Sequence, residues 1–146
     1  AVDIGTDYLD FRIRFQNTGN ATATDVVLRD QLSTDLDWST LQVIGHSHEV
    51  TSAAIGENGQ LVVRFNNIQL PDSTNDEPNS HGYVAYRIKP VASLNVGDAI
   101  ENTAAIYFDL NAPVITNTTA ASVLDSSVNQ RAGQSQGIAV TAYDRY

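Results

Sequence analysis

The chain has 146 residues and a net charge of −9, from 8 Lys and Arg against 17 Asp and Glu. This length suffices for one domain with its own hydrophobic core, and the acidic balance argues against a nucleic-acid-binding surface. No apolar run is long enough for a membrane helix, and the absence of Cys removes disulfides and thiolate chemistry. The absence of Met, even at position 1, predicts a segment of a longer precursor.

Taken in order, the chain favours short β-strands. Residues 9–16 alternate apolar and polar side chains, and a period of two is typical of a half-buried strand. Turn-forming residues occupy positions 17–20, and a β-branched run follows at 26–28. Further strands are expected at residues 41–44, 48–55, 61–68, 82–89, 99–108 and 114–119. The Asn58-Gly59 pair predicts a hairpin between two of them.

No stretch carries a sustained helical stripe of apolar residues, so helix is expected only as a turn at residues 33–36. Seven or eight short strands predict an all-β protein, an immunoglobulin-like antiparallel β-sandwich. We expect the sandwich in residues 1–121 and a polar linker or tail in residues 122–146. Residues 138–143 alternate again and predict an extra strand, on this sandwich or on a neighbour; a loosely held chain end is the alternative.

Several segments, in this order, resemble a known family. Phe-Arg-Ile-Arg-Phe-Gln-Asn-Thr-Gly at 11–19 resembles the opening of the conserved-repeat domains of bacterial surface proteins, and Gly-Asp-Ala-Ile-Glu-Asn-Thr-Ala-Ala-Ile at 97–106 resembles their closing half. Leu-Pro-Asp-Ser at 70–73 and Ser-His-Gly-Tyr-Val at 80–84 resemble a subgroup near the C-termini of proteins exported by the type IX secretion route. The resemblance covers about residues 7–119. It implies an immunoglobulin-like sandwich on a secreted or cell-surface multidomain protein, with no assigned catalytic residues.

An acidic loop at residues 72–81 is the most conspicuous polar cluster. Its Asp72, Asn75, Asp76 and Glu77 offer the oxygen ligands that calcium prefers. The spacing differs from that of an EF-hand loop. The sequence therefore indicates a candidate calcium site, with calcium as the one expected cofactor. The alternative is a loop whose polar side chains cap their own backbone.

Two histidines, His46 and His48, alternate on an expected strand and would share a face, as a zinc site requires. No third ligand is identifiable, and solvated surface histidines are the alternative. Among the aromatic residues, Trp38 is the candidate ligand-binding side chain, because an exposed indole stacks on sugar rings. A Trp that closes one end of the sandwich is the alternative. Tyr83 and Tyr86 have opposite strand parity, so one of them is expected in the core.

Two functions of different classes follow. The first is a non-catalytic structural, adhesion or spacer module of a secreted or cell-surface bacterial protein, without enzyme activity. The second is a carbohydrate-binding accessory module of a secreted polysaccharide-degrading enzyme. The expected partners are neighbouring domains of the same protein and a surface glycan or protein, whereas nucleic acid and membrane insertion are not expected. A third interpretation, a metal-dependent hydrolase, requires the histidines and acidic loops to converge.

Overall fold

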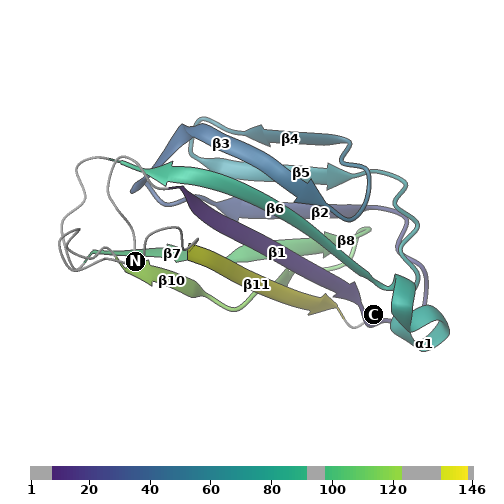
Figure 1. Ribbon diagram of the computed structural model, residues 1–146. Helices are drawn as coiled ribbons and strands as arrows, with labels where there is room; N and C mark the ends of the chain where they lie inside the picture. Colours follow the sequence, from purple (N-terminus) through teal and green to yellow (C-terminus); the bar gives the residue numbers. More distant parts are fainter. Residues whose placement is uncertain (1–7, 92–97, 123–135, 145–146) are drawn as a thin grey trace.

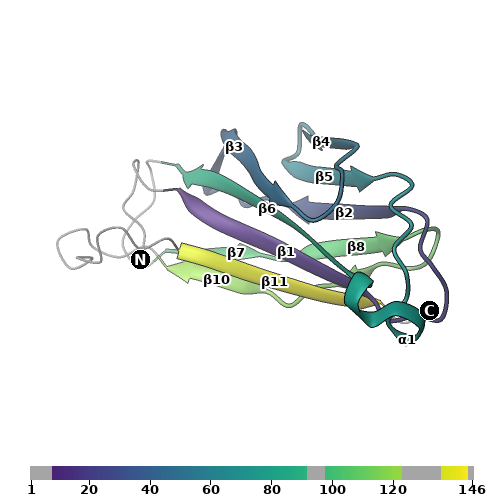
Figure 2. The same ribbon diagram turned by 45° about the vertical axis from the view of Figure 1, so that its right-hand side comes forward.

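The computed structural model describes residues 8–91, 98–122 and 136–144. Two β-sheets pack face to face, with strand orders β11-β1-β6-β3 and β4-β5-β2-β8-β9 (Figures 1 and 2); we call them the front sheet and the back sheet. A two-stranded sheet, β10-β7, lies beside them. The strands are β1 (Leu9–Asn17), β2 (Val26–Gln31), β3 (Leu36–His46), β4 (Ser52–Ile55), β5 (Gln60–Phe65), β6 (His81–Pro90), β7 (Ala99–Asn102), β8 (Ala104–Phe108), β9 (Val114–Ile115), β10 (Thr119–Ser122) and β11 (Gln136–Asp144).

The core lies between the two sheets and consists of alternate residues of the central strands. In β1 the inward positions are all buried, and β6, β2, β5 and β8 repeat this pattern. Within the front sheet Phe11 stacks on Tyr86 at 5.2 Å between ring centroids, and two further aromatic contacts join the layers, where Phe15 packs against Phe65 and Phe108 of the back sheet. The strand alternation in the sequence therefore predicted the buried face correctly, and the fold is an all-β, immunoglobulin-like sandwich.

The β1–β11 pair differs from the other ladders. β11 pairs with β1 in parallel, from Leu9↔Gln136 to Asn17↔Asp144, whereas the other strand pairs are antiparallel. Both strands point to the right in Figure 1. The start of β1 and the end of β11 therefore lie at opposite ends of the front sheet. No helix of the described residues is long and apolar enough to span a membrane.

Three expected elements were wrong in their details. The strand expected at 99–108 is divided at Thr103, because β7 pairs with β10 while β8 pairs with β2 and β9. The strand expected at 48–55 begins at Ser52, since the preceding residues carry the chain from one sheet to the other. At 33–36 the chain forms a hydrogen-bonded turn without a helix, and helix occurs instead at α1 (Ser73–Asp76), followed by a 3-10 turn, η1 (Glu77–Asn79).

The predicted hairpin is confirmed between β4 and β5. Gly56 and Gln60 close it by a backbone hydrogen bond of 3.0 Å, and Gly59 has a φ of 82°. A Cβ at position 59 would also overlap the indole of Trp38. Glycine is thus required here both for the left-handed conformation and for the close approach of the ring.

Candidate functional site

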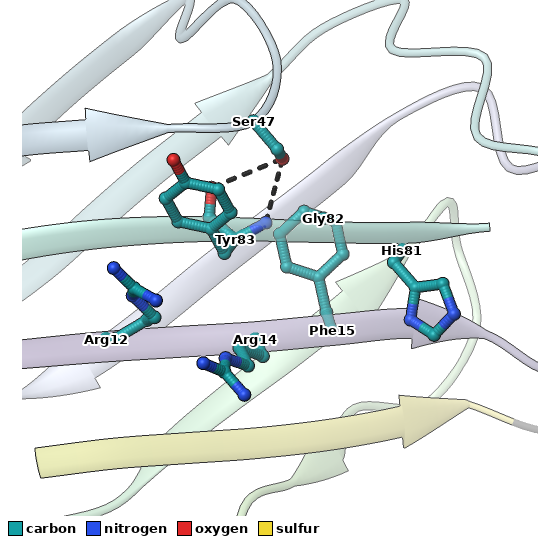
Figure 3. A pocket seen from close by; sticks show the side chains of 7 residues that line it. All are labelled: Arg12, Arg14, Phe15, Ser47, His81, Gly82 and Tyr83. Carbon is teal, nitrogen blue, oxygen red and sulfur yellow. Dashed lines mark hydrogen bonds between the residues drawn. The ribbon is translucent and has the colours of Figure 1, made fainter. Parts of the chain in front are cut away.

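A pocket of about 460 Å³ opens on the outer face of the front sheet, near the start of β6 (Figure 3). We call it the arginine pocket. Its size falls within the range of small-molecule binding sites. Its lining comes from β1, β6 and the residue that follows β3: Arg12, Arg14, Phe15, Ser47, His81, Gly82 and Tyr83.

The alternation of β1 and β6 places these side chains. Arg12 and Arg14 lie on the outer face because Phe11, Ile13 and Phe15 take the inward positions. Tyr83 is outward for the same reason, while Tyr86 is fully buried, which confirms the expected division between the two tyrosines. Gly82 pairs with Phe15 in the β1–β6 ladder.

Gly82 forms part of the floor by lacking a side chain. A Cβ at this position would overlap the ring of Phe15 and come within 3.1 Å of Ser47 Oγ. The ring of Phe15 belongs to the core, where it contacts Phe65 and Phe108. The pocket floor is therefore supported directly by the packed interior.

Ser47 fixes one wall of the pocket. Its Oγ accepts a hydrogen bond from the Tyr83 backbone N–H at 2.8 Å, and its own N–H donates to the Tyr83 carbonyl at 3.0 Å. Figure 3 shows the Ser47 side chain above the Tyr83 backbone. These bonds continue the β3–β6 ladder by one residue, and so the position of Tyr83 is set by backbone contacts.

The rim near His81 is a polar cluster. His81 Nε2 contacts Glu77 Oε1 at 2.5 Å, and Gln16 donates from Nε2 to Ser80 Oγ at 3.0 Å. Gln16 is 8% exposed although it lies on the outer face of β1. The short helical segment before β6 therefore covers this end of the front sheet and brings one carboxylate to the rim.

The two arginines differ from the rim residues in having no hydrogen-bonding partner. The Arg12 guanidinium lies 5.1 Å from the centroid of the Tyr83 ring, a cation–π distance. Within the described part of the chain, neither Arg12 nor Arg14 makes a hydrogen bond or an ion pair. Both are exposed. The chemistry available here is the recognition of an anion by guanidinium groups.

A second polar cluster lies in the core. Tyr86 donates a hydrogen bond of 2.6 Å to Asp30 Oδ2, while Asp30 Oδ1 and both amide atoms of Asn102 are buried and within hydrogen-bonding distance of no suitable partner among the described residues. Burial raises the pKa of Asp30 to about 6, and the Tyr86 hydrogen bond offsets part of that effect. Burial together with the Asp30 charge raises the pKa of Tyr86 well above its usual value. The cluster is closed to solvent and offers no access to a substrate.

The candidate calcium residues each have a separate partner. Asp72 caps α1 and accepts hydrogen bonds from the Asn75 backbone and side-chain amides at 2.9–3.1 Å; these bonds lower the pKa of Asp72. Asp76 accepts from Asn79, and Glu77 contacts His81. Among the described residues, no three acidic or histidine side chains form a group suited to a metal ion. The structure thus provides no shared ligand set, and calcium binding stays a prediction.

Trp38 lies against the core at the β4–β5 hairpin. Its Nε1 donates to the Ser33 carbonyl at 3.0 Å, and its ring lies over Gly59. The remaining exposed part lines a shallow hollow with Leu36, Ser39 and Val91. Sugar stacking at Trp38 stays a prediction, and the hollow is separate from the arginine pocket.

The two histidines do not share a strand. β3 ends at His46, and His48 lies in a bend where its Nδ1 is 2.7 Å from Ser47 Oγ. Partial burial lowers the pKa of His48. The expectation that both histidines alternate on one strand was wrong, because β3 ends at His46 and its pairing with β6 continues only to Ser47.

Comparisons with known proteins give a family match and several similar solved structures. No curated protein matches it. Solved structures similar to it include a cohesin of ScaC from Acetivibrio cellulolyticus in complex with a dockerin (14% identity, 80% of this chain, 100% of that chain, TM-score 0.42). Another is the collagen-binding domain of a Staphylococcus aureus adhesin (12% identity, 81% and 97%, TM-score 0.43). A family model matches residues 1–122, and the chain belongs to that family, described as a domain of unknown function, DUF7619.

Proposed function

We propose that this domain is a non-catalytic structural module that transmits tension between neighbouring domains of a secreted or cell-surface bacterial protein. The observation that carries the proposal is the parallel pairing of β1 with β11 along nine residues of each strand. The sequence resemblance to conserved-repeat domains supports the location, and its subgroup motifs support export by the type IX route.

The geometry favours a mechanical role for a physical reason. A force that pulls the start of β1 and the end of β11 apart slides the two strands along each other (Figure 1). All the hydrogen bonds between the strands then bear the load together, and none breaks before the others. In an antiparallel pair pulled from one end, the bonds break one after another.

Single-molecule force spectroscopy tests this proposal. The chain has no Cys, so one engineered cysteine gives a unique handle. Pulling between the N- and C-termini loads β1 and β11 in shear. As the control, a handle at Lys89→Cys, paired with the N-terminus, peels β6 from β1, because Leu9 lies opposite Ile88.

We expect a clearly higher unfolding force in the terminal geometry than in the Lys89 geometry. A chain ending at Ser122, which lacks β11, should lose the difference while still unfolding cooperatively on heating. Equal forces in the two geometries of the full chain would contradict the proposal.

A further inference from the structure

The basic side chains of this acidic protein gather on one surface. Six Lys and Arg fall within the described residues. Four of them lie on the outer face of the front sheet, where they alternate with buried core residues: Arg12, Arg14, Arg87 and Lys89. The whole chain has a net charge of −9, so this face is a locally basic surface on an acidic protein.

The four cations fall into two groups. Arg87 and Lys89 lie over the ring of Tyr8, at 4.0 and 4.9 Å from its centroid, and Asp10 is opposite Arg87 in the ladder. Arg12 and Arg14 lie further along β1, beside the arginine pocket. The second group is exposed and makes no ion pair within the described residues, so its charge is accessible to a ligand.

The spacing of the second group suits an acidic ligand. Two residues on one face of a strand are about 7 Å apart along it. Each guanidinium presents a planar set of donors that matches a carboxylate or a sulfate. Tyr83 holds Arg12 by the cation–π contact, which reduces the freedom that the side chain loses on binding.

The remaining lining distinguishes between classes of acidic ligand. Beside the arginines the pocket is lined by the Tyr83 side chain, by the His81 ring, which contacts Glu77, and by Ser47, whose hydroxyl is bonded to the Tyr83 backbone, with the floor at Gly82 and Phe15 (Figure 3). A pyranose ring with an acidic group matches this set, because it carries hydroxyls around an apolar ring face. A flexible acidic peptide side chain would use the cations alone.

We propose that the arginine pocket binds an acidic sugar unit of a polysaccharide, with its carboxylate or sulfate group held by Arg12 and Arg14. The inference is independent of the mechanical role. It moves the carbohydrate-binding hypothesis from Trp38, which packs at the β4–β5 hairpin, to a charged site on the outer face of the front sheet.

Isothermal titration calorimetry of the full chain tests the proposal with four probes. Oligogalacturonate supplies carboxylates, and a chondroitin sulfate oligomer supplies sulfates. Cellohexaose is the neutral sugar, and polyglutamate is the acidic peptide. The tested variant is Arg12→Gln/Arg14→Gln. The matched control, Arg29→Gln/Arg64→Gln, removes the two arginines from the back sheet.

We expect at least one acidic oligosaccharide to bind, with affinity about tenfold or more weaker in the Arg12/Arg14 variant and unchanged in the control. The tighter of the two acidic sugars identifies the acidic group. The proposal is overturned if neither binds, if cellohexaose or polyglutamate binds as tightly, or if both variants lose affinity equally. Thermal melting of each variant verifies folding, and Arg14→Gln alone replaces the double variant should that fail to fold.

Discussion

Two arginine–tyrosine pairs lie on opposite outer faces of the sandwich. Arg12 is over Tyr83 on the front sheet, and Arg29 is over Tyr107 on the back sheet at 5.7 Å. Arg29 also donates to Gln60 Oε1 at 3.1 Å, so its guanidinium is engaged within its own sheet. Arg12 instead lies beside a second exposed arginine, Arg14, and beside the arginine pocket. A cation over an aromatic ring is an ordinary surface feature, and it becomes a candidate site only with those two additions.

The largest expected effect concerns the core between the two faces. The pKa of Asp30 is raised from 3.8 to about 6. Between these two pH values the folded state therefore keeps the carboxyl proton, whereas the unfolded state releases it. The stability associated with this group is complete below about pH 4 and is lost as the pH rises through 6, a change of ~3 kcal/mol. Asp30→Asn keeps an acceptor for Tyr86 and cannot ionise.

We therefore expect Asp30→Asn to be more stable than the wild type at pH 8 by up to ~3 kcal/mol, with little difference near pH 4, in urea unfolding at several pH values. Parallel pH curves for the two proteins would show that Asp30 does not carry this dependence. The variant also helps to compare the two outer faces. Ligand binding can then be measured at several pH values on a protein whose stability no longer depends on the ionisation of Asp30.

Gly82→Ala is expected to have the next largest effect. The new Cβ would overlap the Phe15 ring, and overpacking of this kind costs about 1–3 kcal/mol. Gly45→Ala is the matched control on the same sheet, since its Cβ would make an ordinary contact of 3.5 Å with Tyr83. Chemical unfolding should separate the two variants; equal stabilities would mean that the pocket floor does not rest on the core.

Asp72→Ala is expected to cost about 1 kcal/mol, because the residue is the N-cap of α1. In the part of the chain that the structure describes, this helical segment lies at the rim of the front sheet, directly before His81, so the variant should loosen that rim. Since hydrogen bonds from Asn75 lower the pKa of Asp72, the wild type should lose this contribution as the pH falls through the lowered pKa, whereas the variant has none to lose. Melting curves at pH 3 and pH 7 measure the difference.

The same protein pair tests calcium binding at the loop. If calcium binds there, a chelator lowers the melting temperature of the wild type and leaves Asp72→Ala unchanged. If the melting temperature of the wild type is unaffected by calcium and by chelator, the calcium prediction fails.

The smallest effect is expected when the tyrosine of either arginine–tyrosine pair is replaced. A cation–π contact contributes about 0.5–1 kcal/mol at an exposed site, so Tyr83→Leu should weaken binding of an acidic oligosaccharide about two- to fivefold. Tyr107→Leu, the equivalent change on the back sheet, should leave the affinity unchanged. A loss of the same size in both variants would remove the distinction between the two faces.

Much of the fold was predictable because it depends on local patterns. The alternation in β1 predicted its buried face, Asn58-Gly59 predicted the hairpin, and the opposite parity of Tyr83 and Tyr86 predicted that one of the two rings is buried. The α1 turn was missed, although Asp72 followed by Ser73 is a typical start of a helix.

The arginine pocket was not predictable in the same way. Arg12 and Arg14 are ordinary outward residues of a strand, and nothing in their own segment sets them apart. Ser47 reaches Tyr83 across 36 positions of sequence, and the space above Phe15 depends on its pairing with Gly82. These are consequences of strand pairing between distant segments, which the one-dimensional pattern does not specify.

The most direct test of the central claim, that the arginine pocket on the outer face of the front sheet is the binding site, is to map amide chemical shifts by NMR during titration with oligogalacturonate and chondroitin sulfate oligomers. We predict that the shift changes concentrate on residues 12–15, 47 and 81–83, with β2 and β5 of the back sheet unaffected. Changes centred on Trp38 or on the back sheet, or no saturable change with either sugar, would contradict the claim.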